Sequence, residues 1–367
     1  MFLGVFLLVY GGAHFYIWSR LVHPLGLDGA ALWLMRLLFV ALFVSFPLIH
    51  FVFRERDASF ISGAAFVSSV WMGMIVYFVL VTYCFDLVRL YFLGGEPINE
   101  AAITCIVAIV VAITIYGLAE ARSIGITNLN VAMPNLPAHL SGMKIAQISD
   151  VHMGLIVRGP RLEKIVNMVN ELNPDLIVIT GDLVDAEALH MEDMVHPLMR
   201  LKSKYGIFAV PGNHEYFAGI ERAQAFIEEA GVTMLRNRWV TIADGLQLAG
   251  RDDPISPRMT GEPVPSLAEI MEDADRSKPT VLLYHTPDST FAELQAQGVH
   301  LQLSGHTHKG QVWPFNLIVR TIFKTYYGRF TSGDTTIYVS RGTGTWGPPM
   351  RVLARPEITL ITLRAKP

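Results

Sequence analysis

The chain has 367 residues, of which 51% are hydrophobic and 17% are charged, and its net charge of −3 excludes the strongly basic surface of a general nucleic-acid binder. The apolar residues are concentrated in the first third, because no lysine precedes Lys144 and charged residues are sparse before residue 123. This change in composition predicts a membrane domain followed by a water-soluble domain.

Four apolar segments in the first third approach or exceed the ~20 residues that cross a bilayer as a helix. They cover residues 2–18, 30–53, 60–93 and 101–118. The first segment has neither a basic start nor a small-residue cleavage site, which favours a membrane helix over a signal peptide. We therefore expect a transmembrane domain of four helices over residues 1–122.

The arginines at the ends of these segments predict the orientation. Four spans place both ends of the domain on one side of the membrane, together with Arg54, Arg56 and Arg122, whereas Arg20 and Arg89 fall on the other side. Because positive residues favour the cytoplasmic side, the pattern predicts a cytoplasmic C-terminal domain, by a margin of one arginine.

Residues 123–142 have the composition of a linker or a lead-in strand, and a catalytic domain is expected over residues 143–367. Within it the expected strands cover residues 144–148, 175–180, 206–210, 246–249, 280–284 and 299–303, and the expected helices cover 160–172, 188–201, 219–230 and 290–297. Short apolar strands that alternate with amphipathic helices are typical of an α/β fold with parallel strands. The tail from residue 327, with runs at 335–339 and 358–363, has the pattern of antiparallel strands.

Five of the apolar runs end in side chains that can bind a metal ion. In chain order these side chains are Asp150, His152, Asp182, Asn213, His285, His306 and His308. Because ligands bind beyond the carboxyl ends of strands in open α/β sheets, we expect the seven side chains to converge. They are too many for one tetrahedral zinc but suit two metals that share a carboxylate. Carboxylate, imidazole and amide donors together favour manganese, iron or zinc.

Such a pair of divalent ions predicts phosphoester chemistry. Two ions about 3.5–4 Å apart stabilise the attacking and the leaving oxygen of an in-line displacement. A water between them would lose a proton near neutral pH, so that metal-bound hydroxide becomes the nucleophile. We therefore expect a metal-dependent phosphoric ester hydrolase.

The ordered motifs Asp-X-His, Gly-Asp, Gly-Asn-His-Glu, a lone His and Gly-His-X-His, from Asp150 to His308, resemble those of the calcineurin-like metallophosphoesterase superfamily. The tail at residues 340–344, 347–349 and 355–357 is similar to the bacterial membrane-associated branch of that superfamily. The resemblance implies two packed mixed β-sheets flanked by helices, and a location in a bacterial inner membrane.

The resemblance also implies a role for each motif residue. The first metal would be held by Asp150, His152 and His308, the second by Asn213, His285 and His306, and both by the bridging Asp182. His214 would contact the scissile phosphate or protonate the leaving oxygen, and Glu215 would orient the His214 ring. Asp185 is interpreted as a residue that supports the ligands or caps a helix.

The membrane tether makes a lipid-linked phosphate a reasonable substrate class, with the scissile bond in a phosphodiester, a phosphomonoester or a pyrophosphate. A narrower alternative is a UDP-diacylglucosamine pyrophosphate hydrolase of lipid A synthesis. An alternative of another class is a non-catalytic membrane sensor or scaffold that binds metal without turnover. The expected partners are a phosphorylated substrate and membrane lipid, and no nucleic acid is expected.

Residues 311–330, directly after the last motif, combine aromatic and basic side chains. The aromatic residues are Trp313, Phe315, Phe323, Tyr326, Tyr327 and Phe330, and the basic residues are Arg320, Lys324 and Arg329. One interpretation is a membrane interface or a contact with an amphipathic lipid phosphate. The other is a hairpin that packs over the edge of the sheet.

Overall fold

The structure is a computed structural model that describes residues 2–53, 59–92, 94–95, 98–185 and 192–366. Its contacts divide the chain into two compact units. One contains Met1–Ala119 with Gly347–Met350, and the other contains Glu120–Trp346 with Arg351–Pro367. The two units are described separately.

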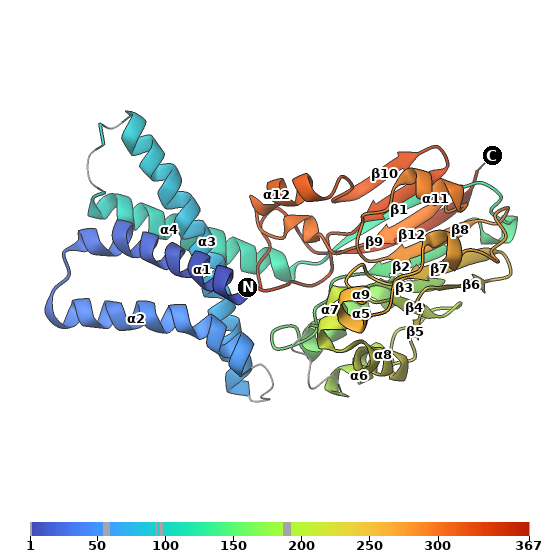
Figure 1. Cartoon of the computed structure of the whole chain (residues 1–367), viewed down its shortest axis with the longest axis horizontal. Helices are drawn as coiled ribbons and strands as arrows, with labels where there is room; N and C mark the ends of the chain where they lie inside the picture. Colours follow the sequence, from blue (N-terminus) through green and yellow to red (C-terminus); the bar gives the residue numbers. More distant parts are fainter. Residues whose placement is uncertain (1, 54–58, 93, 96–97, 186–191, 367) are drawn as a thin grey trace. The chain divides into compact units, whose positions relative to one another are not determined.

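The first unit is helical, with α1 (Phe2–Ile17), α2 (Gly29–Pro47), α3 (Ser59–Phe92) and α4 (Glu100–Arg122) (Figure 1). Short π and 3-10 turns extend the first two helices, so that four candidate membrane spans cover Leu3–Leu25, Gly29–Val52, Phe60–Phe92 and Glu100–Arg122. Each of the four expected spans therefore forms a helix long and apolar enough to cross a bilayer. Arg54 and Arg56, on which the predicted orientation partly depends, lie outside the described residues.

The second unit contains two six-stranded mixed sheets (Figure 1). The first sheet has the order β1 (Gly125–Met133), β12 (Glu357–Ala365), β2 (Lys144–Ile148), β3 (Leu176–Thr180), β4 (Ile207–Val210) and β5 (Thr233–Met234). The second has the order β10 (Gly328–Ser332), β11 (Thr335–Val339), β9 (Leu301–Ser304), β8 (Thr280–Tyr284), β7 (Leu246–Arg251) and β6 (Arg238–Ile242). Strands β2 to β5 and β7 to β9 run parallel to their neighbours within each set, which confirms the predicted α/β fold.

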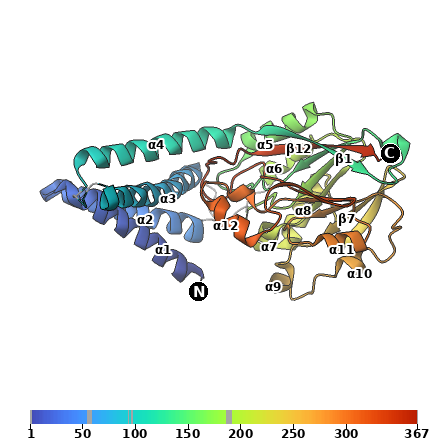
Figure 2. The ribbon, with the colours of Figure 1, turned by 90° about the horizontal axis from the view of Figure 1, so that it is seen from above.

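A hydrophobic core fills the space between the sheets, where Ile145 and Val178 of the first sheet meet Leu283 and Leu303 of the second. The outer face of the first sheet is covered by α5 (Gly159–Glu171), α6 (Glu192–Leu198) and α8 (Ile220–Glu229). The outer face of the second is covered by α10 (Leu267–Ile270) and α11 (Phe291–Ala296). Figure 2 shows α5 and α6 on one side of this unit and α10 and α11 on the other. The predicted pair of packed sheets flanked by helices is confirmed.

The prediction of a linker over residues 123–142 is wrong for most of that segment. Residues 125–133 form β1, which pairs in parallel with β12 over its whole length, as the alternative of a lead-in strand anticipated. Leu129, Val131 and Met133 are buried while their neighbours are exposed, which is the alternation of a strand with one face on the core.

The C-terminal tail is only partly an antiparallel arrangement. Strands β10 and β11 form the expected antiparallel pair, but β12 lies in the other sheet, antiparallel to β2 and parallel to β1. The hairpin interpretation of residues 311–330 is also wrong, because residues 315–322 form the helix α12 (Phe315–Ile322). Of the helix expected at 188–201, the part at Glu192–Leu198 is formed, and residues 188–191 lie outside the described residues.

Candidate metal centre

The seven predicted donors lie together, beyond the carboxyl ends of the strands that precede them. They stand in the loops after β2, β3, β4, β8 and β9. Three of the motif glycines are placed where a side chain would not fit. A Cβ atom on Gly305 would overlap Ser149 and Asp150, one on Gly212 would overlap Asp182, and one on Gly181 would overlap His285. The glycines therefore allow the donor-bearing loops to approach one another closely.

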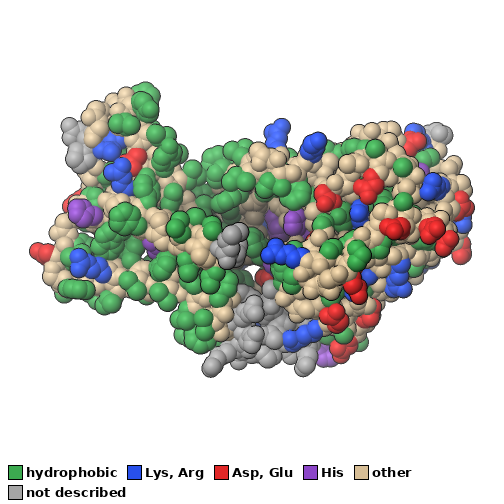
Figure 3. Space-filling view, viewed as in Figure 1, with side chains coloured by type: hydrophobic (Ala, Val, Ile, Leu, Met, Phe, Trp, Pro, Cys, Tyr) green, Lys and Arg blue, Asp and Glu red, His purple; other side chains and the backbone are tan. Residues whose placement is uncertain are grey.

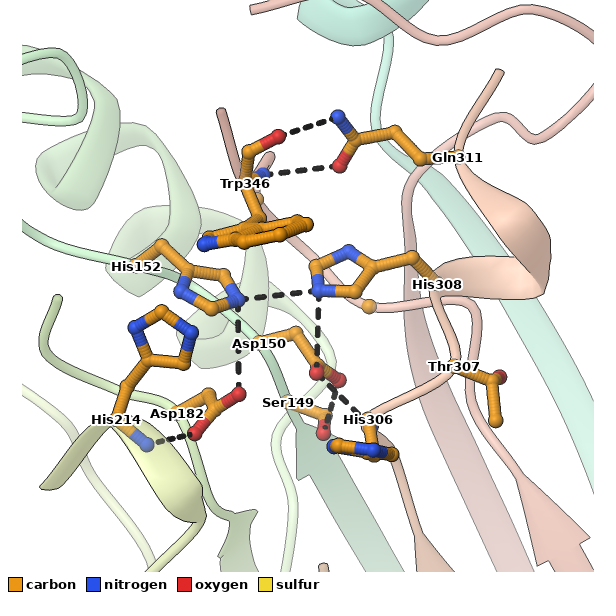
Figure 4. Close-up of polar contacts among 12 residues, drawn as sticks. Ser149, Asp150, His152, Asp182, His214, His306, Thr307, His308, Gln311 and Trp346 are labelled. Carbon is orange, nitrogen blue, oxygen red and sulfur yellow. Dashed lines mark hydrogen bonds and ion pairs between the residues drawn. The ribbon is translucent and has the colours of Figure 1, made fainter. Parts of the chain in front are cut away.

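One group of donors comprises Asp150, His152 and His308, whose ligand atoms lie within 4.8 Å of one another. His152 Nε2 is 3.0 Å from His308 Nε2, and His308 Nε2 is 3.4 Å from Asp150 Oδ1 (Figure 4). These are the three residues predicted to hold the first metal. Two imidazole nitrogens and a carboxylate oxygen that face one point form an arrangement that a divalent cation can occupy.

A second group comprises Asp182, His285 and His306, again within 4.8 Å of one another. His306 Nδ1 is 3.2 Å from His285 Nε2 and 3.0 Å from Asn213 Oδ1. Asn213 is the first residue of α7 (Asn213–Ala218), so the start of this helix places the amide oxygen beside the two imidazoles. His285 and His306 of this group, together with the neighbouring Asn213, are the three residues predicted for the second metal.

Asp182 lies between the two groups. Its Oδ2 is 3.1 Å from His285 Nε2 and 3.7 Å from His152 Nε2, so that one oxygen faces an imidazole of each group. The other oxygen, Oδ1, accepts a hydrogen bond from the His214 backbone N–H at 2.9 Å. This position matches that of a carboxylate shared by two metal ions.

Electrostatics keep three of the four imidazoles neutral. Burial lowers the pKa of His152 to about 4 and that of His306 to about 3. Burial, together with the positive charge of Arg351, holds the pKa of His308 well below its usual value. Neutral imidazoles keep a nitrogen lone pair available, which metal binding requires.

His285 differs because it lies against Asp182. Burial opposes the charged form, but the carboxylates of Asp182, Asp150 and Asp253 together outweigh burial and raise the pKa of His285 well above its usual value. The ring donates from Nδ1 to the Thr180 carbonyl oxygen at 2.8 Å, so the proton at issue is the one on Nε2 facing Asp182. A cation bound between these two atoms would take the place of that proton, and the bond to Thr180 would orient the ring toward it.

The donor set fits two divalent cations. Asp150 and Asp182 are buried carboxylates, and their ion pairs among the described residues are with histidines. Burial raises the pKa of Asp150 to about 6, a sign that its negative charge has too little compensation in the protein alone. Bound cations would supply that compensation.

The backbone around these donors is strained. Asp150, His152, Asp182, His306 and His308 all have positive φ angles, between 48° and 70°. Such angles cost of order 1 kcal/mol or more for residues other than glycine and concentrate at functional sites. The positive φ values turn each side chain at the end of its strand toward the common centre.

His214 lies beside the first group, with its ring centroid 4.6 Å from that of His152. Its Nδ1 is 2.7 Å from Asp185 Oδ1. Burial lowers the pKa of His214, but the carboxylates of Asp182 and Asp185 outweigh burial and raise it to about 9. The two carboxylates therefore favour the protonated ring, which can donate a hydrogen bond or a proton at the edge of the site.

The role expected for Glu215 is wrong. Its carboxylate accepts hydrogen bonds from the backbone N–H groups of Asp182, Leu183, Val184 and Gly212, at 2.6 to 3.0 Å. It thereby fixes the loop that carries Asp182, and the orientation of the His214 ring falls to Asp185. In the sequence, Asp185 stands out only because it follows Asp182 by three residues. This spacing does not show whether Asp185 contacts the His214 ring or caps a helix.

Sequence reasoning missed two further residues at the site. Arg351 is fully buried and donates to the His308 carbonyl oxygen at 3.1 Å, while its Nη2 lies 3.1 Å from His308 Nδ1. Trp346 exchanges two backbone hydrogen bonds with the side chain of Gln311, and in Figure 4 its indole lies over His152 and His308. Neither residue belongs to a motif that would predict its burial or its contact with the metal ligands.

Known proteins share this domain. A family model for the calcineurin-like phosphoesterases matches residues 143–310. An uncharacterized metallophosphoesterase of Helicobacter pylori is 38% identical over 225 residues, which cover 61% of this chain and 60% of that protein's length. A Danio rerio transmembrane protein with a metallophosphoesterase domain is 30% identical, covering 95% of this chain and 86% of its own length. A Campylobacter jejuni uncharacterized metallophosphoesterase is 29% identical, covering 99% and 98%. The chain belongs to the calcineurin-like metallophosphoesterase family.

Proposed function

We propose that this chain is a membrane-anchored phosphoesterase that hydrolyses a phosphodiester, phosphomonoester or pyrophosphate bond with the help of two divalent metal ions. The observation that carries the proposal is the position of Asp182, whose Oδ2 faces His152 of one donor group and His285 of the other. The family uses a dinuclear metal centre. Bound at these residues, manganese, iron or zinc would supply Lewis-acid activation of water and of the phosphoryl group.

The residues of the chain have separable tasks in this proposal. Asp150, His152 and His308 would hold one ion, His285, His306 and Asn213 would hold the other, and Asp182 would serve both. His214, protonated and held by Asp185, binds a phosphate oxygen or gives its proton to the leaving oxygen. Glu215 acts through the backbone of the Asp182 loop and so keeps the shared carboxylate in place.

A lipid-linked phosphoester is the substrate class that we propose. Support comes from the four helices able to span a membrane and from relatives described as transmembrane proteins. The proposed location is a bacterial inner membrane with the catalytic unit in the cytoplasm. The pyrophosphate bond of UDP-diacylglucosamine falls within this class and is a narrower candidate.

A metal-supplemented activity screen of the purified full chain tests the proposal. Lipid phosphates, nucleotides and sugar nucleotides would each be offered with manganese, iron or zinc. We expect turnover of at least one lipid-borne phosphoester, and we expect Asp182→Ala to abolish turnover of every substrate because the two ions lose their common ligand. Absence of turnover with all metals and substrates would instead favour the non-catalytic sensor or scaffold.

A further inference from the structure

Helix α12 presents an apolar surface to the surroundings of the catalytic unit. All eight of its residues are described, and none is buried. Leu317, Ile318 and Ile322 are 56%, 54% and 66% exposed, and Trp313 just before the helix is 43% exposed. Figure 3 shows hydrophobic side chains gathered over this region, with histidine beside them. A contiguous apolar surface of this kind on a folded domain marks a site of interaction.

The charged side chains of the segment that contains α12 are all positive. Lys309, Arg320, Lys324 and Arg329 lie in the stretch between Glu293 and Asp334, and that stretch contains no acidic residue. An apolar helix surface flanked by cations is the pattern of a helix that lies in the interface of a membrane with anionic lipids. The charge pattern therefore favours an anionic lipid surface as the occupant.

The short connection between α4 and β1 keeps the catalytic unit close to the bilayer. Helix α4 ends at Arg122 and β1 of the catalytic unit begins at Gly125. Since each residue spans at most about 3.6 Å, the catalytic unit remains next to any membrane that α4 crosses. Binding of α12 to that membrane is thus an intramolecular step with a high effective concentration of lipid.

Helix α12 is joined to the metal loop at both ends. At its start, Gly310 lies so close to the backbone of Asn316 that a Cβ atom would not fit. After its end, the ring of Phe323 lies edge-on to His306 with centroids 5.4 Å apart, and Thr307 Oγ1 donates to the Tyr326 carbonyl oxygen at 2.6 Å. A lipid surface that binds α12 is therefore brought to the loop that carries His306 and His308.

Exposed aromatic side chains also lie beside His214. Phe217 and Trp346 are 45% and 54% exposed, with ring centroids 5.5 Å and 6.0 Å from that of His214. Apolar side chains thus flank the metal centre both at α12 and at the proposed proton donor. This arrangement suits a phosphate group that carries an acyl chain.

We infer that α12 docks into the headgroup region of an anionic bilayer and thereby presents lipid-borne phosphoesters to the metal centre. The docking itself stands on the surface of α12, whereas the delivery of substrate rests on the proposed function. The two parts are tested by separate measurements.

Docking is tested with an environment-sensitive fluorophore attached to Ile318→Cys, in a full chain whose Cys84 and Cys105 are replaced by alanine. The labelled protein is reconstituted into phosphatidylcholine vesicles with or without phosphatidylglycerol. We expect a blue-shifted emission, quenched by nitroxide-labelled lipid, and more strongly so with phosphatidylglycerol. The same probe on Met259→Cys, which is 46% exposed on α9 (Ser256–Thr260), should stay in water. A probe at 318 that stays in water, or that is shielded without being quenched by lipid, overturns the inference, and the second result indicates a protein partner.

Delivery is tested with Leu317→Gln/Ile322→Gln in the same vesicles. Because the two substitutions remove apolar side chains from the surface that would enter the bilayer, we expect a loss of about tenfold or more in turnover of a vesicle-borne phosphoester. Turnover of a small soluble phosphodiester should be unchanged, and Met259→Gln should change neither. Equal losses on both substrates overturn the delivery role. If the wild type hydrolyses neither substrate with any metal, the proposed function fails, while the fluorescence measurement still decides the docking.

Discussion

His306 and His308 are separated by one residue but face different groups of donors. His308 Nε2 faces His152 and Asp150, whereas His306 Nδ1 faces His285 and Asn213. The positive φ angles of both histidines allow the two rings to diverge within one short loop. In the proposed dinuclear centre, this one loop would therefore supply a ligand to each metal ion.

Single substitutions in this loop should each remove a different metal ion. His306→Ala and His308→Ala should each bind about one ion fewer than the wild type, and the double variant should bind none, because each imidazole belongs to one position. Metal content measured by inductively coupled plasma mass spectrometry checks this. His139→Ala, an exposed histidine that lies in no motif, is the control. A double variant that keeps one ion would show that both histidines serve the same position.

Asp185 should set the pH range in which His214 works. Asp185→Asn removes a carboxylate that raises the pKa of His214, so the ring should lose its proton at a lower pH. If His214 acts as the proton donor, activity declines as the pH rises through its pKa. The alkaline limb of the kcat/KM profile should therefore move to lower pH in the variant. An alkaline limb that does not move would argue against protonated His214 as the active form.

The residues of the site were predictable to different degrees. All seven predicted donors meet in the structure because each directly follows a strand or a glycine-bearing motif, and ligand sites form beyond the carboxyl ends of parallel strands, here those of both sheets. The partners of those donors were not predictable from local pattern. Arg351 is buried against His308, and an arginine is buried only when the fold supplies acceptors such as the Gly344 and Arg341 carbonyl oxygens.

At the scale of elements, strands buried on both faces were predicted well and edge elements were not. Strands β2, β3, β4, β8 and β9 are short apolar runs, which one-dimensional pattern detects. Strand β6 lies at a sheet edge and has mostly exposed or partly exposed residues, and α12 combines an arginine with exposed apolar residues. Neither sequence is therefore the continuous apolar run that is typical of a buried element. The partner of β12 depends on long-range packing, and its place in the first sheet had no local signal.

Glu357 links three strands and should be a main contributor to the stability of the catalytic unit. This fully buried carboxylate at the start of β12 accepts hydrogen bonds from Thr127 of β1, Tyr338 of β11 and the Arg341 guanidinium. Because Glu357→Gln leaves the guanidinium without its counter-charge, we expect a loss of about 3 kcal/mol in the free energy of unfolding. The fall in the thermal unfolding midpoint of the metal-loaded protein checks this.

The control for this variant is Glu293→Gln, which removes the partner of Arg251 in an ion pair of 3.0 Å. The Glu293 side chain is 34% exposed, so the solvent screens that pair and the cost should be less than about 1 kcal/mol. Equal shifts of the unfolding midpoint in the two variants would show that Glu357 has no special structural role.

At the scale of the whole molecule, the change in composition after residue 122 marks the main division of the chain. The contacts place the boundary between Ala119 and Glu120 in this part of the chain, and the four helices before it are those that the hydropathy pattern predicts. Composition locates this boundary because a bilayer and water select opposite side chains. It does not identify α12, whose eight residues are too few to affect a hydropathy average.

The account as a whole depends on two metal ions acting together in one catalytic unit. The most direct test is a titration of the metal-depleted full chain with manganese, in which bound metal and phosphoester turnover are measured in the same samples. The account predicts that turnover follows the occupancy of the second ion and reaches its maximum at about two ions per chain. Full turnover at one ion per chain, or turnover that persists in the metal-depleted protein, would contradict it.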